Sequence, residues 1–245
     1  MNRSTLASVA ALIVIGAGQG ASQEARPAPT ALAPKSMARI GNVDSRFQSY
    51  NVEMIEVTGG KFWKPYSSMA SPRLAPSPSP SASGTPGGLN PDLYEYRAPI
   101  DLARPRLRAL AAALAPAYMR VSGTWANSTF LSEDDTVPPA PPAGFGGVLS
   151  RAQWKGVVDF SRAVDAPIVT SMATSVGTRD AAGVWTPTQA RRFLAYTRSL
   201  GGHIVAAEFM NEPNFASIGG APPGYDAAAY GRDFKVFRAF AKEAA

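Results

Sequence analysis

Four strand-like segments alternate with four helix-like segments after residue 45, and this alternation constrains the fold more than any other feature of the chain. The strand-like segments are short runs of apolar and β-branched residues, and the helix-like segments repeat apolar residues at helical spacing. The strand-like segments cover 49–57, 117–121, 167–173 and 204–210, and the helix-like segments cover 104–116, 150–164, 186–202 and 226–245. Regular alternation of this kind predicts an α/β protein with parallel strands joined by crossover helices.

Two α/β architectures fit this order, an open doubly wound sheet and a (β/α)8 TIM barrel. No G-x-G-x-x-G pattern follows the first strand-like segment, which weakens the dinucleotide-binding form of the open sheet. Four βα units are half of a barrel, and the last helix-like segment runs to the last residue without a closing turn. We therefore expect residues 46–245 to be the truncated N-terminal half of a (β/α)8 barrel.

The first 22 residues have the pattern of a secretory signal peptide. Arg3 supplies a positive charge, Leu6 to Ile15 are apolar, and a run of small residues follows. The apolar stretch is too short to span a bilayer comfortably. We expect residues 1–22 to be removed and residues 23–45 to form a Pro/Ala-rich N-terminus. The protein is then expected to be secreted, extracellular or periplasmic, with no membrane span.

Composition excludes several functional classes. The chain has no cysteine and a single histidine, so thiolate chemistry and multi-histidine metal sites are excluded. Its net charge of +6 comes from scattered Lys and Arg residues, with no basic stripe of the kind that binds nucleic acid. We therefore expect no nucleic-acid partner. The histidine, His203, precedes the fourth strand-like segment and is expected at the surface.

Two inserts rich in Pro and Gly interrupt the alternation. Residues 71–88 follow the first strand-like segment, and residues 137–147 follow the second. They are either surface linkers or long loops at the carboxyl ends of strands, where barrel active sites are built. Shortly before the second insert, Asn127-Ser128-Thr129 matches the acceptor pattern for N-linked glycans.

The stretch FMNEPNF, residues 209–215, sets a single acid at the end of the fourth strand-like segment. Pro213 cannot donate to a strand ladder, so pairing stops there, and it biases Glu212 toward an extended backbone. The apolar neighbours Phe209 and Phe215 predict a desolvated carboxyl group, as a general acid requires. The alternative is an acid that caps a local turn.

Two charged residues lie within apolar strand-like segments. Arg120 belongs to the second segment and Glu208 to the fourth. A buried charge needs a partner, so we expect an ion pair between them if the inner face of the sheet brings these segments together. This ion pair would support the site structurally from below and would take no part in the reaction.

The motif EFMNEPN, residues 208–214, resembles the acid/base motif of clan A glycoside hydrolases, in which Asn-Glu closes the fourth barrel strand. More narrowly, the span from Phe47 to Lys242 resembles the heparanase-like glycosidases of family 79, which are endo- or exo-acting β-glucuronidases. The segments that carry the resemblance, in the order of the family, are FQSYNVEM, YMRVSGTW, SLGGHIVAAEFMNEPNF and YGRDFKVFRAF.

The resemblance implies a retaining mechanism with two carboxylates and no metal or cofactor. Glu212 would be the acid/base, and Asn211 would hydrogen-bond the sugar hydroxyl next to the anomeric carbon. The nucleophile would come from the seventh strand, outside this chain, so the chain alone is expected to be inactive. Glu53 matches an acidic position of the family that lines the substrate pocket, and the alternative for it is a strand residue paired with a base.

The resemblance also bears on the substrate. The family places a basic residue after the threonine that matches Thr124, whereas this chain has Trp125, so that contact to a sulfated or carboxylated chain is missing. Trp125 is expected either to stack on a sugar face or to pack in the core. The substrates that the resemblance favours are β-glucuronide glycans, which contain uronic acid. The alternatives are a clan A glycosidase on neutral β-glycans, such as xylan, and a non-catalytic carbohydrate-binding half-barrel.

Overall fold

The computed structural model describes residues 33–65 and 91–245. The chain divides into two units, Met1–Asn42 and Val43–Ala245. The described residues of the first unit are exposed and hold one 3-10 turn, η1 (Pro34–Ser36). The predicted signal peptide and the insert 71–88 lie outside the described residues.

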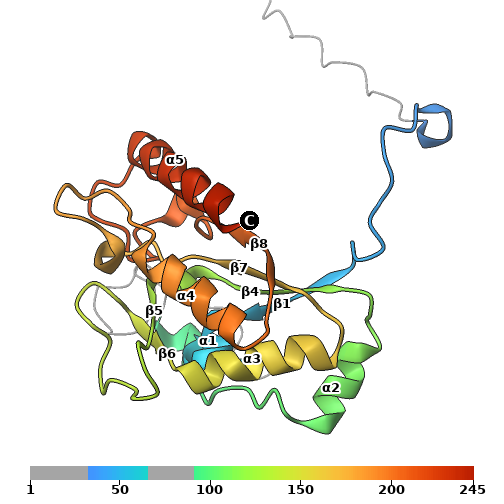
Figure 1. Ribbon diagram of the computed structural model, residues 1–245, viewed down its shortest axis with the longest axis horizontal. Helices are drawn as coiled ribbons and strands as arrows, with labels where there is room; N and C mark the ends of the chain where they lie inside the picture. The colour runs from blue at the N-terminus through green and yellow to red at the C-terminus, as the bar shows by residue number, and fades with distance from the viewer. Residues whose placement is uncertain (1–32, 66–90) are drawn as a thin grey trace, which may run out of the picture. The chain divides into compact units, whose positions relative to one another are not determined.

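The second unit is a mixed α/β structure built on a four-stranded parallel sheet (Figure 1). Its strands, in the spatial order of the sheet, are β1 (Ser49–Glu53), β4 (Tyr118–Ser122), β7 (Ile168–Ser171) and β8 (Ile204–Glu208). Every neighbouring pair is parallel. The predicted parallel strands are therefore confirmed.

Along the chain, one of four helices comes directly before each of the strands β4, β7 and β8, and the last helix follows β8. These helices are α2 (Pro105–Ala112), α3 (Arg151–Ala163), α4 (Thr188–Ser199) and α5 (Ala227–Ala244). Ser150 caps α3: its hydroxyl accepts from the Gln153 backbone N–H at 3.1 Å, and the Gln153 side chain accepts from the Ser150 N–H at 2.9 Å. This reciprocal pair satisfies two N–H groups at the start of the helix, which is why α3 begins there.

The first strand is shorter than predicted, because residues 54–57 are helical. β1 ends at Glu53 and α1 (Met54–Thr58) begins at once. The Glu56 carboxylate accepts a hydrogen bond from the Glu53 N–H at 2.9 Å, which stabilises the first turn. Met54 and Val57 then both face the core, each 3% exposed. Their three-residue spacing suits a helix, and the apolar content alone did not separate it from a strand.

Two smaller sheets lie in the connections and were not predicted. β2 (Gly60–Trp63) pairs antiparallel with β3 (Tyr94–Arg97), and β5 (Thr129–Leu131) pairs parallel with β6 (Gly147–Leu149). The second insert, 137–147, leads into β6. In it, the ring of Phe145 packs against Phe130 at 5.2 Å between centroids.

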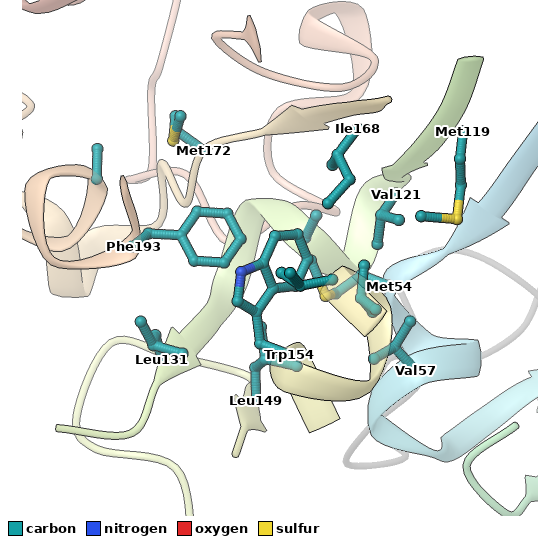
Figure 2. Close-up of a cluster of buried hydrophobic side chains, with 14 of the residues drawn as sticks. Met54, Val57, Met119, Val121, Leu131, Leu149, Trp154, Ile168, Met172 and Phe193 are labelled. Carbon is teal, nitrogen blue, oxygen red and sulfur yellow. The ribbon is translucent and has the colours of Figure 1, made fainter. Parts of the chain in front are cut away.

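The core lies between one face of the sheet and α3 and α4 (Figure 2). Trp154 of α3 is fully buried there, with its ring centroid 4.3 Å from that of Phe193 on α4. Its indole N–H donates to the Thr197 hydroxyl at 2.8 Å, so its one polar group is satisfied. Met119 and Val121 of β4 point into this core. The intervening Arg120 must therefore point to the opposite face of the sheet.

No helix in the described parts of the chain is both long and apolar enough to cross a membrane.

Candidate active site

The face of the sheet opposite the core carries a network of polar side chains centred on Arg120. The guanidinium of Arg120 forms two hydrogen bonds with the Glu208 carboxylate, one of them at 2.8 Å from Nη2 to Oε2. Nη1 donates to Asn51 Oδ1 at 2.6 Å. The predicted ion pair between β4 and β8 is thus confirmed. Hydrogen bonding to Glu208 raises the pKa of Arg120 against the opposing effect of burial, so the guanidinium stays charged.

Asn211 connects this network to Glu212. Its Oδ1 accepts from Arg120 Nη2 at 2.9 Å. Because a guanidinium can only donate, the amide nitrogen of Asn211 must point the other way. There it donates to Thr124 Oγ1 at 3.1 Å and to Glu212 Oε2 at 3.2 Å. The Thr124 hydroxyl also donates to Glu212 Oε2, at 2.6 Å. The carboxylate of Glu212 is therefore held by two donors of fixed orientation.

The backbone at Glu212 differs from the prediction. β8 ends at Glu208, so Glu212 lies beyond the strand, and its φ of 48° and ψ of 62° are left-handed rather than extended. The Glu212 carbonyl accepts from Phe215 N–H at 2.8 Å, which closes the 3-10 turn η6 (Pro213–Phe215). Pro213 occupies the first position of this turn, where it has no N–H to satisfy. A left-handed non-glycine residue is strained by about 1–2 kcal/mol, and such strain concentrates at functional sites.

The expected desolvation of Glu212 is not seen. Phe209 and Met210 are buried, but they lie behind the site, and Phe215 is 53% exposed. Glu212 itself is exposed. The aromatic contacts of Phe209 explain the difference: its ring packs against Trp185 at 5.4 Å and Phe237 at 5.3 Å, so it fills the core instead of shielding the carboxylate.

Glu53 supplies a second carboxyl group to the site from the end of β1. Its Oε1 accepts from Asn51 Nδ2 at 2.8 Å. The other oxygen lies over Gly123, at which a Cβ would stand only 1.5 Å from Oε2. Burial raises the pKa of Glu53, the Asn51 bond and the charge of Arg120 oppose this rise, and the charges of Glu56 and Glu212 add to it. Glu53 is thus the more desolvated acid of the site and is electrostatically coupled to Glu212.

A cavity of about 460 Å³ brings the predicted residues together. The residues that line it are Glu53, Trp63, Tyr94, Thr124, Trp125, Asn211, Glu212, Phe215 and Ile218. The predicted residues come from three neighbouring places: Glu53 ends β1, Thr124 and Trp125 follow β4, and Asn211 and Glu212 follow β8. They meet because the carboxyl ends of parallel strands lie at one edge. The insert 137–147 contributes no lining residue.

One wall of the cavity is aromatic, and the sequence did not predict most of it. Trp63 of β2 stacks on Tyr94 of β3 at 4.6 Å between ring centroids. Trp125 packs edge-on against Phe62 at 5.3 Å and against Tyr94 at 6.4 Å. Trp125 is half-buried, packs against these rings of the cavity wall and is not part of the main hydrophobic core. Its stacking on a sugar stays a prediction. The aromatic residues of β2 and β3 were visible in the sequence, but nothing in it linked the two segments.

The remaining predictions concern metals and His203. Among the described residues, no group of three or more His, Cys, Asp or Glu side chains could hold a metal ion. His203 is exposed just before β8, as predicted. It does not line the cavity.

The arrangement can form hydrogen bonds with a polar ligand and can exchange a proton with it through a carboxyl group. Two carboxyl groups, an amide and a hydroxyl offer hydrogen bonds to the polar groups of a ligand, and the aromatic rings offer it a flat apolar surface. A scan against models of protein families matched none, and a search of curated proteins found no match.

Proposed function

We propose that this chain belongs to a retaining β-glycosidase of the heparanase-like family 79 type, with Glu212 as the general acid/base. The observation that carries the proposal is the fixed carboxylate of Glu212 at the cavity, held by Thr124 at 2.6 Å and Asn211 at 3.2 Å. A strained backbone at the same residue supports it. The motif resemblance adds the assignment to clan A.

In this proposal the four-stranded sheet is the first half of a (β/α)8 barrel. The order β1-β4-β7-β8 is that of consecutive barrel strands, and each pair is parallel. Within the described residues, no strand pairs with the outer edge of β1 or of β8. Unpaired edges of this kind are closed in a barrel. The cavity lies at the carboxyl ends of the strands, where barrel enzymes carry their active sites.

In this mechanism Glu212 carries out both proton transfers. In the first step its carboxyl group protonates the glycosidic oxygen while a second carboxylate, about 5–5.5 Å away, attacks the anomeric carbon. In the second step the Glu212 carboxylate takes a proton from the water that displaces the sugar. Thr124 and Asn211 keep the carboxylate oriented between the steps. The proposal takes the nucleophile from the seventh barrel strand, by resemblance.

The leading substrate class is a β-glucuronide, by the same resemblance. A neutral β-glycan is the second candidate, and one observation favours it. The described lining of the cavity holds two acidic residues, Glu53 and Glu212, and aromatic rings, but no Lys or Arg. A uronate carboxylate would need a basic partner from another part of the protein.

The test is to compare the complete wild-type protein with Glu212→Gln on aryl β-glycosides with good and poor leaving groups, uronic and neutral. Loss of the proton donor should lower kcat/KM by about 10²–10⁴-fold for poor leaving groups. The loss should be smaller for good ones, which depart unprotonated. Azide should restore turnover and give a β-glycosyl azide, because it needs no base to attack.

Glu243→Gln serves as the matched control, since Glu243 lies at the surface on α5, pairs with Arg191 and does not line the cavity. It should leave activity unchanged. Equal losses with both leaving groups, and no effect of azide, would show that Glu212 is not the acid/base. Binding of sugars without turnover in any form would favour the non-catalytic carbohydrate-binding alternative.

A further inference from the structure

Asn127 is one of the most buried polar residues of the protein, with 1% of its surface exposed. It lies in the 3-10 turn η4 (Thr124–Ser128) that follows β4. The sequence there matches a glycosylation acceptor, but the side-chain nitrogen that would carry a glycan is inside the structure and already donates a hydrogen bond. In the folded protein the Asn127 side chain therefore forms internal hydrogen bonds instead of carrying a glycan.

The side chain of Asn127 pairs with the backbone of Asn211 at both of its polar groups. The Asn211 N–H donates to Asn127 Oδ1 at 3.0 Å, and Asn127 Nδ2 donates to the Asn211 carbonyl at 2.8 Å. A neighbouring β-strand would form the same two kinds of hydrogen bond, one to the N–H and one to the carbonyl of an extended residue. It occurs across 84 residues of chain, so it is a tertiary contact rather than a local turn.

The pairing of Asn127 with the Asn211 backbone holds the chain beyond the end of the sheet. The Met172 N–H donates to the Glu208 carbonyl at 3.2 Å, and the next backbone hydrogen bond between these two connections runs from the Val176 N–H to the Gly220 carbonyl, at 3.0 Å. Asn211 lies three residues further on, without a strand beside it. Its side chain orients Glu212, and Glu212 then turns into the left-handed region. Asn127 thus anchors the chain one residue before the strained position.

Asn127 also fixes a third loop. Its carbonyl accepts from the Thr174 N–H at 2.7 Å and from the Ser175 N–H at 2.9 Å, both in the connection after β7. Gly219 packs directly on its side chain, because a Cβ at that position would lie 2.5 Å from Asn127 Nδ2. One residue therefore ties together the loops that follow β4, β7 and β8.

We infer that Asn127 is a positioning residue of this site: its amide holds the Asn211 peptide and so sets the direction of the Asn211 side chain and the Glu212 carboxylate. This inference rests on the proposed function for its effect on turnover, but its structural part stands independently. It also means that the folded protein carries no glycan at Asn127, since the acceptor nitrogen is buried and engaged.

The first test measures amide hydrogen exchange in the full chain. Asn127→Ala should raise the exchange rate of the Asn211 amide by about tenfold or more, the factor that corresponds to one hydrogen bond of ordinary net strength. The matched control is Thr197→Val, which removes another buried side-chain hydrogen bond, the one from Trp154, on the core face of the sheet. The control should leave the Asn211 amide as protected as in the wild type. Unchanged exchange at Asn211 in Asn127→Ala overturns the inference, whatever the protein catalyses.

The second test measures turnover of an aryl β-glycoside by the complete protein. Asn127→Ala should lower kcat on the order of 10²-fold, because a misplaced catalytic group loses rate of that size, and should change KM little. Thr197→Val should lower thermal stability without lowering kcat. Equal kcat losses in both variants would show a merely structural role. A wild type without turnover, combined with faster Asn211 exchange in Asn127→Ala, would reject the proposed function while keeping the positioning role.

Gly219→Ala covers the case in which Asn127→Ala does not fold. The added methyl group would press on Asn127 Nδ2 without deleting it, and the glycine has no positive φ that alanine would strain. The same rise in Asn211 exchange and the same fall in kcat are expected, to a smaller degree. No change in either quantity would contradict the inference.

Discussion

The hydroxyl of Thr124 donates a hydrogen bond of 2.6 Å to the carboxylate of Glu212, although 88 positions separate the two residues in the chain. Thr124 follows β4 and Glu212 follows β8, which are not neighbours in the sheet. The contact shows that the loops at the carboxyl ends of the strands converge over β7. The site is built from these loops and depends on how they are held.

Replacing Thr124 should therefore weaken the proposed acid/base. Thr124→Val removes the donor at constant shape, and hydrogen bonds to charged groups contribute about 1.5–3 kcal/mol, so kcat should fall by about 10–100-fold. Thr124→Ser keeps the hydroxyl and should stay within about threefold of the wild type. Steady-state kinetics on an aryl β-glycoside with a poor leaving group checks this. A Val variant as active as the Ser variant would contradict it.

Glu53→Gln should change the dependence of stability on pH. The folded-state pKa of Glu53 is raised from its ordinary value of 4.5, mainly by burial. Folding then favours the protonated acid, so stability from this group is present at low pH and is lost as the pH rises through the raised pKa. Glutamine cannot ionise, so the variant should gain stability relative to wild type at about pH 7 and not at about pH 4.

Melting temperatures of the Glu53→Gln variant and the wild type, measured at both pH values, test this expectation. Glu243→Gln is the control for loss of a surface carboxylate. If the difference in melting temperature between Glu53→Gln and wild type is the same at both pH values, or larger in acid, burial of Glu53 is not the dominant effect.

Gly123→Ala should destabilise the protein through a direct clash with Glu53. A Cβ there would stand 1.5 Å from Glu53 Oε2, and the φ of 97° is one that alanine rarely adopts. Overpacking of this kind costs about 1–3 kcal/mol, to which the backbone strain adds. Urea unfolding would measure the loss. Gly156→Ala in α3 is the matched control: nothing lies within 4 Å of its Cβ, and it should gain about 0.5–1 kcal/mol. A Gly123→Ala variant as stable as the wild type would contradict both the clash with the Glu53 carboxylate and the backbone strain at this position.

Trp63→Ala should weaken ligand binding at the aromatic wall. Trp63 stacks on Tyr94 at the cavity, and loss of one stacked ring is expected to cost about 0.5–1.5 kcal/mol, or about 2–10-fold in Kd. Calorimetric titration with an aryl β-glycoside that has a poor leaving group, which Glu212→Gln should turn over only slowly, compares Glu212→Gln with the double variant Glu212→Gln/Trp63→Ala. Tyr96→Ala is the control, because Tyr96 lies on β3 beside Tyr94, is 72% exposed and does not line the cavity. Equal Kd values for all three proteins would exclude the wall from binding.

Local patterns were sufficient for the larger elements. Short runs of apolar and β-branched residues predicted the four parallel strands, and apolar residues at helical spacing predicted the helices between them. Local patterns failed in a segment whose apolar composition suits a strand and a helix alike. Residues 54–57 satisfied a strand and a helix equally, and the hydrogen bond between Glu53 and Glu56 decided for the helix.

The sequence by itself singled out Glu212 at the end of an apolar run and the ion pair of Arg120 with Glu208, because charged groups within apolar segments need partners. The family resemblance added Asn211 and Glu53. Only the tertiary structure decided the direction of Glu212, the aromatic wall of Trp63 and Tyr94, and the pairing of Asn127 with Asn211. These depend on contacts across tens of residues, and a backbone angle such as φ of 48° at Glu212 persists only where such contacts hold it. No local pattern carries that information, since the energy that selects the conformation comes from residues brought together by the fold.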